Sequence, residues 1–527
     1  MKLATPEIDF ITDLGEGIIN RRRFLTGTAA LGAGLFVSGH MSKVQAKTAG
    51  TLVLGLSAFP PNLRPFDHAG ASANTVKLQT FRGLLGYGSD GKVREELAEK
   101  WSFDGDRTYT FKIRDNAVFH NGEPVTAEDV AFSIQQISAK GSTAYLAEEF
   151  RGIEKVDVID RKNITLILAK PTPSFVGSLA GQFAMIISKK AFTEKADNWV
   201  GAGPFKITSS EKGVRIAFEK FRDFYKPGLP KVETMSFVVY ADENLRSAAL
   251  ETGDVDIIEY VPQQEMDKIA ANPELSLQTT VGPFMYLVFN CETGPFANPK
   301  LRAAVAHAIK REDVVAAAFQ GKGQVLAGLP ITNDSPFFDY KLSQIWSYDP
   351  DRAKSLLKEA GAEGLTVKLS STSTYNYYKD TAEIVQQHLL AIGLNVELEL
   401  LEWGARVAQG NKGQYQFAVA GGGMDASDPD AMSTIIAAQS PSYRRSFGRK
   451  PDKIDELLSV GRHEADPVKR KAIYDELQKV SADIVPVASL CWRTQSYAMQ
   501  KYVTGFQALP GLLNSQSGYA LESAVVG

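Results

Sequence analysis

The sequence predicts a mixed α/β protein that folds into at least two lobes. The chain has 527 residues, which is more than one hydrophobic core normally supports. Apolar and polar residues alternate at 109–113 and at 396–400, as in strands with one buried face. Denser apolar runs at 286–289 and 485–490 fit strands that are buried on both faces. Helix-start signals lie between these stretches, so strands and helices are expected to alternate along the chain.

The first residues of several expected helices carry capping signals. At 298–299, 349–350 and 466–467, an Asn or Asp stands before a proline. This order places an N-cap before a proline at the first helical position, where a missing N–H does no harm. Thr126, with Asp129 three residues later, resembles a capping box. We therefore expect a helix to begin at each of these four places.

Composition and charge exclude several classes of protein. The net charge is −3 and no basic stripe is interleaved with aromatic residues, so nucleic acid is not an expected partner. The sequence lacks the GxSxG, GxxxxGK[ST] and HExxH motifs of common hydrolases, nucleotide-binding proteins and zinc proteases. The six histidines are scattered, and the acidic run 425–430 lacks the order of an EF-hand loop. No metal or other cofactor is expected.

The N-terminus carries the features of an export signal. Residues 20–26 read N-R-R-R-F-L-T, and residues 27–39 form a mildly apolar stretch rich in Gly and Ala. That stretch is shorter than the roughly 20 apolar residues of a membrane span. Small residues at 44–46 then offer a cleavage site, which completes the order of a secretory signal. The paired arginines resemble the twin-arginine type, with Asn20 where Ser or Thr is usual. We expect residues 1–46 to be a signal peptide and the mature protein to be soluble in the periplasm.

Ordered sequence blocks carry a family resemblance that covers nearly all of the mature chain. They include E-L-A-E-K-W at 96–101, T-Y-T-F-K-I-R at 108–114, V-F-H-N-G-E-P-V-T-A-E-D-V at 118–130, G-A-G-P-F-K at 201–206, L-E-T-G-D-V-D at 250–256, F-N at 289–290, P-F at 295–296, L-R-A-A at 301–304 and Y-D-P at 348–350. In this order they are similar to the bacterial extracytoplasmic solute-binding proteins of family 5, the peptide, opine and nickel type.

The resemblance implies a periplasmic-binding-protein-like clamshell with two lobes. Lobe I would hold residues 47–295, including an extra subdomain at about 90–200, and lobe II residues 296–486. Residues 487–527 would return to lobe I. A small-molecule or peptide ligand would bind in the cleft and favour closure, because only the closed state contacts it from both sides. The resemblance further implies a monomer that delivers its ligand to the permease subunits of an ABC importer and is not an enzyme.

Within the resemblance, Asp425 is the leading polar candidate for the ligand site. Residues 423–430 look like a "GD--DPD" segment whose carboxylate binds the ligand's α-amino group in peptide-binding relatives. Asp428 precedes Pro429 and a helix expected at 431–438, so it is interpreted as an N-cap. Asp425 lies outside that helix, next to glycines that allow close approach of a ligand. A solvated loop carboxylate is the alternative.

Aromatic residues form the second group of candidates. Trp403 matches the family's "EWG" block, although core packing is an alternative role. Tyr375 and Tyr377 belong to a patch that precedes a helix expected near 380–390. Peptide-binding relatives often place an arginine near this patch to receive a carboxylate, and this sequence has none there. Arg493, beside Trp492, is the candidate replacement, with a surface position as the alternative.

The residues leave the cargo open among a short peptide, an opine-like amino-acid conjugate and a glycoside. Two other classes also stay open, a secreted hydrolase with paired carboxylates and a sensory receptor of the same fold. The two cysteines, Cys291 and Cys491, each stand near an expected crossing between the lobes. If those crossings run side by side, a disulfide could link them in the oxidising periplasm.

Overall fold

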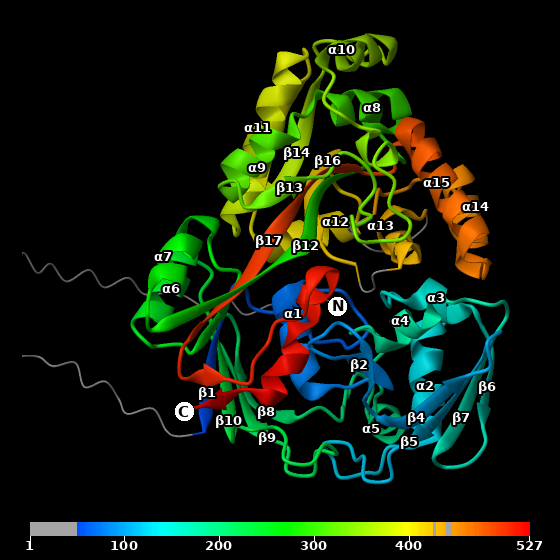
Figure 1. Cartoon of the computed structure of the whole chain (residues 1–527), viewed down its shortest axis with the longest axis vertical. Helices are drawn as coiled ribbons and strands as arrows, with labels where there is room; N and C mark the ends of the chain where they lie inside the picture. The colour runs from blue at the N-terminus through cyan, green and yellow to red at the C-terminus, as the bar shows by residue number, and fades with distance from the viewer. Residues whose placement is uncertain (1–49, 425–427, 439–444) are drawn as a thin grey trace, which may run out of the picture. The chain divides into compact units, whose positions relative to one another are not determined.

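One large sheet forms the centre of the computed structural model, which describes residues 50–424, 428–438 and 445–527. The strand order is β15-β14-β16-β12-β17-β11-β1-β10-β9-β8, and β13 also pairs with β17 (Figure 1). The strands are β1 (Thr51–Leu56), β8 (Phe205–Glu211), β9 (Arg215–Lys220), β10 (Thr234–Val239), β11 (Ile257–Glu259), β12 (Leu275–Phe289), β13 (Gly323–Val325), β14 (Thr366–Thr372), β15 (Asn395–Leu401), β16 (Phe417–Gly422) and β17 (Ala488–Gln500). The mixed α/β class expected from the sequence is confirmed.

The two longest strands, β12 and β17, lie side by side in the middle of this sheet (Figure 1). They pair antiparallel from Leu275 opposite Gln500 to Leu287 opposite Ala488. The register shifts between Val281 and Phe284, where the ladder is irregular. Beyond that shift β12 also pairs with β16, while the far end of β17 pairs with β11. The backbone hydrogen bonds of these two strands therefore join the β14–β16 group to the β1–β11 group.

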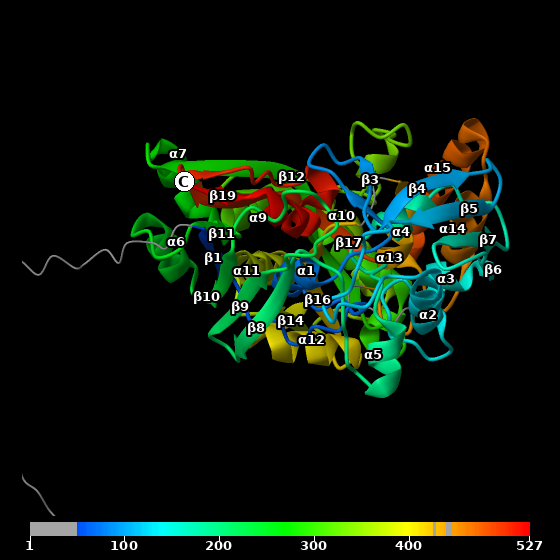
Figure 2. The ribbon, with the colours of Figure 1, turned by 90° about the horizontal axis from the view of Figure 1, so that it is seen from below.

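A smaller four-stranded sheet has a hydrophobic core of its own. Its order is β4-β5-β7-β6, with bounds Ala98–Phe103, Thr108–Ile113, Asn163–Leu168 and Ile153–Val158. Phe111, Phe119 and Leu166 are among the fully buried residues of this core. Figures 1 and 2 show these strands grouped with α2 (Ala127–Ser138) and α3 (Ala147–Arg151), apart from the large sheet. All of these elements lie within the 90–200 segment.

The helices begin where their capping residues stand. Asn298, Asp349 and Asp466 each accept a backbone hydrogen bond at the start of α8 (Pro299–Ala308), α10 (Pro350–Glu359) and α15 (Pro467–Ile484), and Thr126 and Asp129 form the capping box of α2. All four expected helix starts are confirmed. The other α-helices are α1 (Ala71–Thr80), α4 (Phe175–Ala180), α5 (Lys189–Glu194), α6 (Glu243–Glu251), α7 (Met266–Ala271), α9 (Arg311–Phe319), α11 (Asn376–Ala391), α12 (Trp403–Asn411), α13 (Ser433–Ile436) and α14 (Lys453–His463).

The remaining elements are short strands and 3₁₀-helices. They are β2 (Leu85–Tyr87), β3 (Val93–Glu95), β18 (Val503–Thr504), β19 (Val525–Val526), η1 (Gln263–Glu265), η2 (Pro295–Ala297), η3 (Leu342–Gln344), η4 (Pro429–Met432) and η5 (Gly511–Ser523). Over the described ranges, no helix is long and apolar enough to cross a membrane. The expected signal peptide lies outside those ranges.

Two helices differ from their expected extents. Asp428 caps a helical segment as expected, but that segment is η4 followed by α13 and not one helix over 431–438. The first turn is tightened to 3₁₀ geometry, which is common at helix starts. Helix α11 begins at Asn376, earlier than its apolar pattern indicates, so Tyr377 lies within its first turn.

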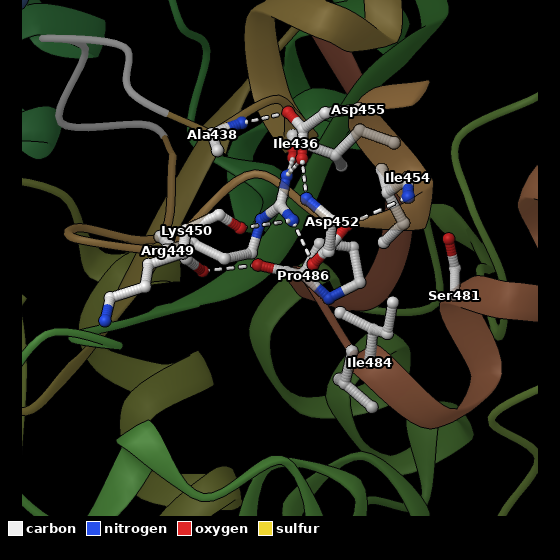
Figure 3. A network of polar contacts seen from close by, with 12 residues as sticks. Ile436, Ala438, Arg449, Lys450, Asp452, Ile454, Asp455, Ser481, Ile484 and Pro486 are labelled. Carbon is white, nitrogen blue, oxygen red and sulfur yellow. Dashed lines mark hydrogen bonds and ion pairs between the residues drawn. The ribbon is translucent and has the colours of Figure 1, made fainter. Parts of the chain in front are cut away.

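A charged network fixes the backbone on both sides of segment 439–444 (Figure 3). The Arg449 guanidinium donates to the carbonyl of Ile436 at 2.7 Å and to Asp455 at 2.8 Å, and it also binds Asp452. Asp455 in turn accepts from the backbone N–H of Ala438 at 2.7 Å. Because Asp452 and Asp455 also form the capping box of α14, one network anchors the end of α13 and the start of α14.

The proposed disulfide between the cysteines is wrong, since Cys291 and Cys491 are both free. Cys491 pairs with Met285 in the ladder, whereas Cys291 follows the end of β12, six residues further along. At about 3.3 Å per strand residue, the two Cα atoms are roughly 20 Å apart. A disulfide requires Cα atoms within about 7 Å. Strands β12 and β17 do run side by side, but their register separates the two thiols.

We expect both thiols to be reduced and slow to react in the native protein. Burial raises the pKa of Cys491 to about 12 and also raises the pKa of Cys291, so little thiolate forms near neutral pH. Thiol titration with a disulfide reagent should label the native protein slowly and reach two thiols per chain after denaturation. A native mass that increases by two hydrogen atoms on reduction would contradict this expectation.

Candidate ligand-binding site

A cavity lies where the ends of β14, β15 and β16 approach β17 and α1. We call it the aromatic cavity. Four of the residues expected at the site line it together, namely Tyr375, Tyr377, Trp403 and Arg493. The other lining residues are Gly70, Ala71, Asn74, Tyr260, Pro283, Tyr378, Gly421, Gly422, Gly423, Gln495 and Ser515.

Parallel strand pairing brings the aromatic residues together. Strands β14 and β15 run parallel and in register, with Thr372 opposite Leu401. Tyr375 and Trp403 follow the carboxyl ends of these strands, the edge at which open α/β sheets usually bind ligands. Their ring centroids are 5.3 Å apart with the planes at 82°, an edge-to-face contact. Burial raises the pKa of Tyr375 well above its usual value, so its phenol is neutral.

Arg493 is a buried cation that lines the aromatic cavity. Its guanidinium lies 5.4 Å from the ring centroid of Tyr260 and 5.1 Å from that of Tyr377. The side chain is buried, and among the described residues its Nε has no hydrogen-bond partner and no carboxylate forms an ion pair with it. Burying a charge is costly, and here tyrosine side chains, including a side-chain hydrogen bond with Tyr260, offset that cost and raise the pKa of Arg493. No carboxylate among the described residues neutralises the charge. The site is therefore suited to an anionic group.

A second arginine positions Tyr260 against Arg493. Tyr260 has a φ of 52°, a left-handed conformation that costs about 1–3 kcal/mol for a residue with a side chain. The fully buried Arg246 holds this turn by donating to the carbonyls of Tyr240, Glu259 and Tyr260 at 2.7, 3.1 and 2.8 Å. Tyr260 lines the cavity from this strained turn, and the hydrogen bonds from Arg246 stabilise the turn.

A buried carboxylate supports the wall behind Tyr375. Glu259 accepts from the backbone N–H of Ser57 at 3.1 Å and from its hydroxyl at 2.8 Å, and it also binds the Ser72 hydroxyl. The Ser57 hydroxyl lies 3.3 Å from the Tyr375 hydroxyl. Sequence reasoning did not identify Glu259, Asn74, Gln495 or Ser515, because no local pattern separates them from other polar residues in strands and helices.

Trp492 does not line the aromatic cavity. Successive residues of a strand face opposite sides, so Arg493 faces the cavity and Trp492 faces away from it. The Trp492 ring packs edge-on against Phe284 with centroids 5.4 Å apart, and it borders a separate hollow that also involves Val281 and Leu512. The neighbouring positions of Trp492 and Arg493 in sequence thus place them on opposite faces.

The acidic run at 425–430 divides into residues with different roles. Asp428 caps η4 and forms two hydrogen bonds of 2.7 Å with the Arg470 guanidinium, and Asp430 binds Arg462. Asp425 lies outside the described residues, whereas Gly423, two residues before it, lines the aromatic cavity. Within the described ranges, no group of histidine, cysteine or carboxylate side chains could hold a metal ion.

Comparisons with known proteins agree with this architecture. The family described as "Bacterial extracellular solute-binding proteins, family 5 Middle" matches residues 92–443. The glutathione-binding protein GsiB of Pectobacterium atrosepticum is 28% identical over 481 residues, covering 88% of this chain and 92% of that protein.

Solved structures extend the similarity to the fold. The binding protein AgaA of A. tumefaciens R10, solved with agropinic acid, is 36% identical with a TM-score of 0.87 and covers 91% of this chain and 99% of its own. The periplasmic binding protein DppA of Helicobacter pylori, solved with the peptide STSA, is 23% identical with a TM-score of 0.81, and the match covers 90% of this chain and 98% of that one. The periplasmic-binding-protein-like fold is thus confirmed. Together with the family match over 92–443, these similarities show that the chain belongs to the family 5 bacterial extracellular solute-binding proteins.

Proposed function

We propose that this protein is the periplasmic substrate-binding component of an ABC importer, and that its ligand is a small organic acid. An opine-like amino-acid conjugate is the favoured ligand, and a short peptide is the second. Agropinic acid, glutathione and the peptide STSA, named with the relatives AgaA, GsiB and DppA, are all carboxylic acids. The greater identity to AgaA, 36% against 28% for GsiB, favours the conjugate.

The observation that carries the proposal is the buried guanidinium of Arg493 in the aromatic cavity, without an ion pair among the described residues. Arginine binds carboxylates through a planar fork of N–H groups. A hydrogen bond to a charged group contributes about 1.5–3 kcal/mol. A ligand carboxylate would therefore supply the negative charge that the described residues do not provide beside Arg493.

Other residues of the aromatic cavity would complete recognition. The rings of Tyr375, Tyr378 and Trp403 offer apolar surface to the body of the ligand. The resemblance assigns the ligand's amino group to Asp425, which follows the cavity-lining Gly423 by two residues. An acid bound at Arg493 and an ammonium bound at Asp425 would fit an amino-acid-derived ligand. Binding would occur without covalent chemistry, as expected for a transport receptor.

Closure of the two proposed lobes around the ligand would follow because residues of both lobes line the aromatic cavity. We propose that residues 47–295 and 487–527 form lobe I and residues 296–486 lobe II, with β12 and β17 as the hinge. Asn74 and Tyr260 then belong to lobe I, and Tyr375 and Trp403 to lobe II. A ligand that contacts both sets binds the closed state more tightly and shifts the equilibrium toward it. Delivery to the permease, and export through a twin-arginine signal at 1–46, complete the proposed role.

The first test of the proposed function replaces Arg493. We expect Arg493→Gln to weaken binding of an acidic ligand by about 10- to 100-fold, which corresponds to the loss of about 1.5–3 kcal/mol. Isothermal titration with agropinic acid, glutathione and the peptide Ser-Thr-Ser-Ala measures this. Arg222→Gln, which removes the same charge from an exposed side chain, should bind as the unchanged protein does. An unchanged dissociation constant in Arg493→Gln would remove Arg493 from the site.

The second test concerns Asp425 and the ligand's amino group. We expect Asp425→Asn to weaken binding of an amine-bearing ligand by about tenfold or more, because the charge-assisted hydrogen bond is lost. The same ligand with its amine acetylated provides the control, since it should bind the variant and the unchanged protein alike. An equal loss for both ligands would assign Asp425 a structural role.

A further inference from the structure

The two proposed lobes also meet at a place that is not part of the aromatic cavity. Figures 1 and 2 both show the α3–α4 region beside the α13–α14 region. The Ser174 hydroxyl donates to the Asp430 carboxylate at 2.7 Å, and Nδ1 of His463 lies 2.8 Å from the Pro171 carbonyl. Because a carbonyl oxygen only accepts, this imidazole nitrogen is the donor. We call these two hydrogen bonds the clasp, and none of their four residues lines the aromatic cavity.

The Ser174 side chain binds across to Asp430 instead of capping its own helix. Ser174 stands at the N-cap position of α4, where a serine oxygen usually accepts from a backbone N–H of the first turn. Its backbone is helical, with φ −76° and ψ −11°, and its side chain makes no capping hydrogen bond. The hydroxyl is therefore available for the charged acceptor Asp430.

Asp430 is held in place from within its own proposed lobe. Its carboxylate is buried, and Nε of Arg462 lies 3.0 and 3.1 Å from its two oxygens. This pairing does not involve Ser174, so the acceptor would stay paired and oriented when the lobes separate. A hydrogen bond to a charged acceptor is about twice as strong as one between neutral groups, which makes Asp430 a favourable partner for the incoming hydroxyl.

The charges on the two sides of the clasp are complementary. Burial lowers the pKa of Arg462, but the carboxylates of Asp430 and Glu149 outweigh burial, so the pKa is raised overall. Burial also lowers the pKa of Arg445, and the attraction of Glu149 opposes that change. Glu149 belongs to α3, on the same side as Ser174. Its attraction to two guanidinium groups on the other side acts in the same direction as the clasp.

We propose that the clasp stabilises the closed state from outside the ligand site and thereby strengthens binding of every ligand by the same factor. This inference rests on the proposed function, because it assumes two lobes that close around a ligand. Pro171 and Ser174 belong to proposed lobe I, and Asp430 and His463 to lobe II, so the two bonds form only on closure. The apparent affinity of a ligand that binds the closed state rises with the closed fraction of the free protein. The clasp residues act as positioning residues, since they do not contact the ligand.

Two substitutions remove the clasp, and each has a matched control. Ser174→Ala deletes one donor, and Ser138→Ala deletes a hydroxyl of similar exposure that donates within α2. His463→Phe keeps an aromatic ring without the donor. His388→Phe makes the same change at a histidine whose partner, Asp313, lies in the same proposed lobe. Of these four side chains, only those of the clasp bind across the lobes.

Calorimetry and small-angle X-ray scattering test the proposal. Titration with agropinic acid, glutathione and the peptide Ser-Thr-Ser-Ala should show that each clasp variant binds about three- to tenfold more weakly, a difference of about 0.7–1.4 kcal/mol. The factor should be the same for every acid that binds. Without ligand, the double variant should have a larger radius of gyration than the unchanged protein, and saturation with ligand should make the two radii equal. Both controls should behave as the unchanged protein does.

The outcomes separate this inference from the proposed function. If the double variant keeps both its dissociation constant and its radius of gyration, the clasp is overturned while acid binding at Arg493 stands. A loss confined to one acid would also overturn the clasp, because its residues would then contact that ligand, and equal losses in the controls would indicate a general loss of stability. If no acid binds at all, the proposed ligand class falls. A larger radius of the ligand-free double variant would then still support the clasp, and an unchanged radius would overturn it.

Discussion

The antiparallel pairing of β12 with β17 is the interaction on which the rest of the structure depends. This pairing joins the β14–β16 group of strands to the β1–β11 group in the large sheet. Its register decides which side chains of β17 face the aromatic cavity. Arg493 faces the aromatic cavity because β17 keeps its alternation through the irregular stretch near Val281. A slip of one residue would bring Trp492 to the cavity and remove the cation, so register and binding chemistry are fixed together.

The buried arginines of the described chain show what is particular to Arg493. The guanidinium of Arg311 donates to the carbonyls of Leu326, Ser489, Trp346 and Ala306, among others, and Arg82 lies between the carboxylates of Glu96 and Glu522. These partners satisfy the charge within the folded chain, as buried ions require. Arg493 contacts tyrosine rings instead. Arg311 and Arg82 therefore stabilise the fold, while the position of Arg493 favours a partner from outside.

Local chemistry could be predicted from the sequence where a few adjacent residues decide the structure. The Asn-Pro and Asp-Pro pairs and the Thr126–Asp129 box predicted four helix starts, because a cap is satisfied within one helical turn. The ordered blocks predicted the family and, through it, the fold. The same reasoning predicted that Asp428, and not Asp425, is an N-cap, because Pro429 directly after Asp428 marks the first turn of a helix. The early start of α11 was not predicted, because aromatic residues favour the first turn of a helix only weakly.

By itself, the sequence determined the elements, their caps and the family, all of which rest on neighbouring residues or on their order. Only the tertiary structure decided which distant residues meet. Tyr375, Trp403 and Arg493 lie far apart in the chain, and parallel pairing of β14 with β15 and antiparallel pairing of β12 with β17 bring them to one cavity. The same register keeps Cys291 away from Cys491. Strand pairing sets such contacts through backbone hydrogen bonds. Because every residue type carries the same backbone groups, the residue types alone do not show which distant strands pair.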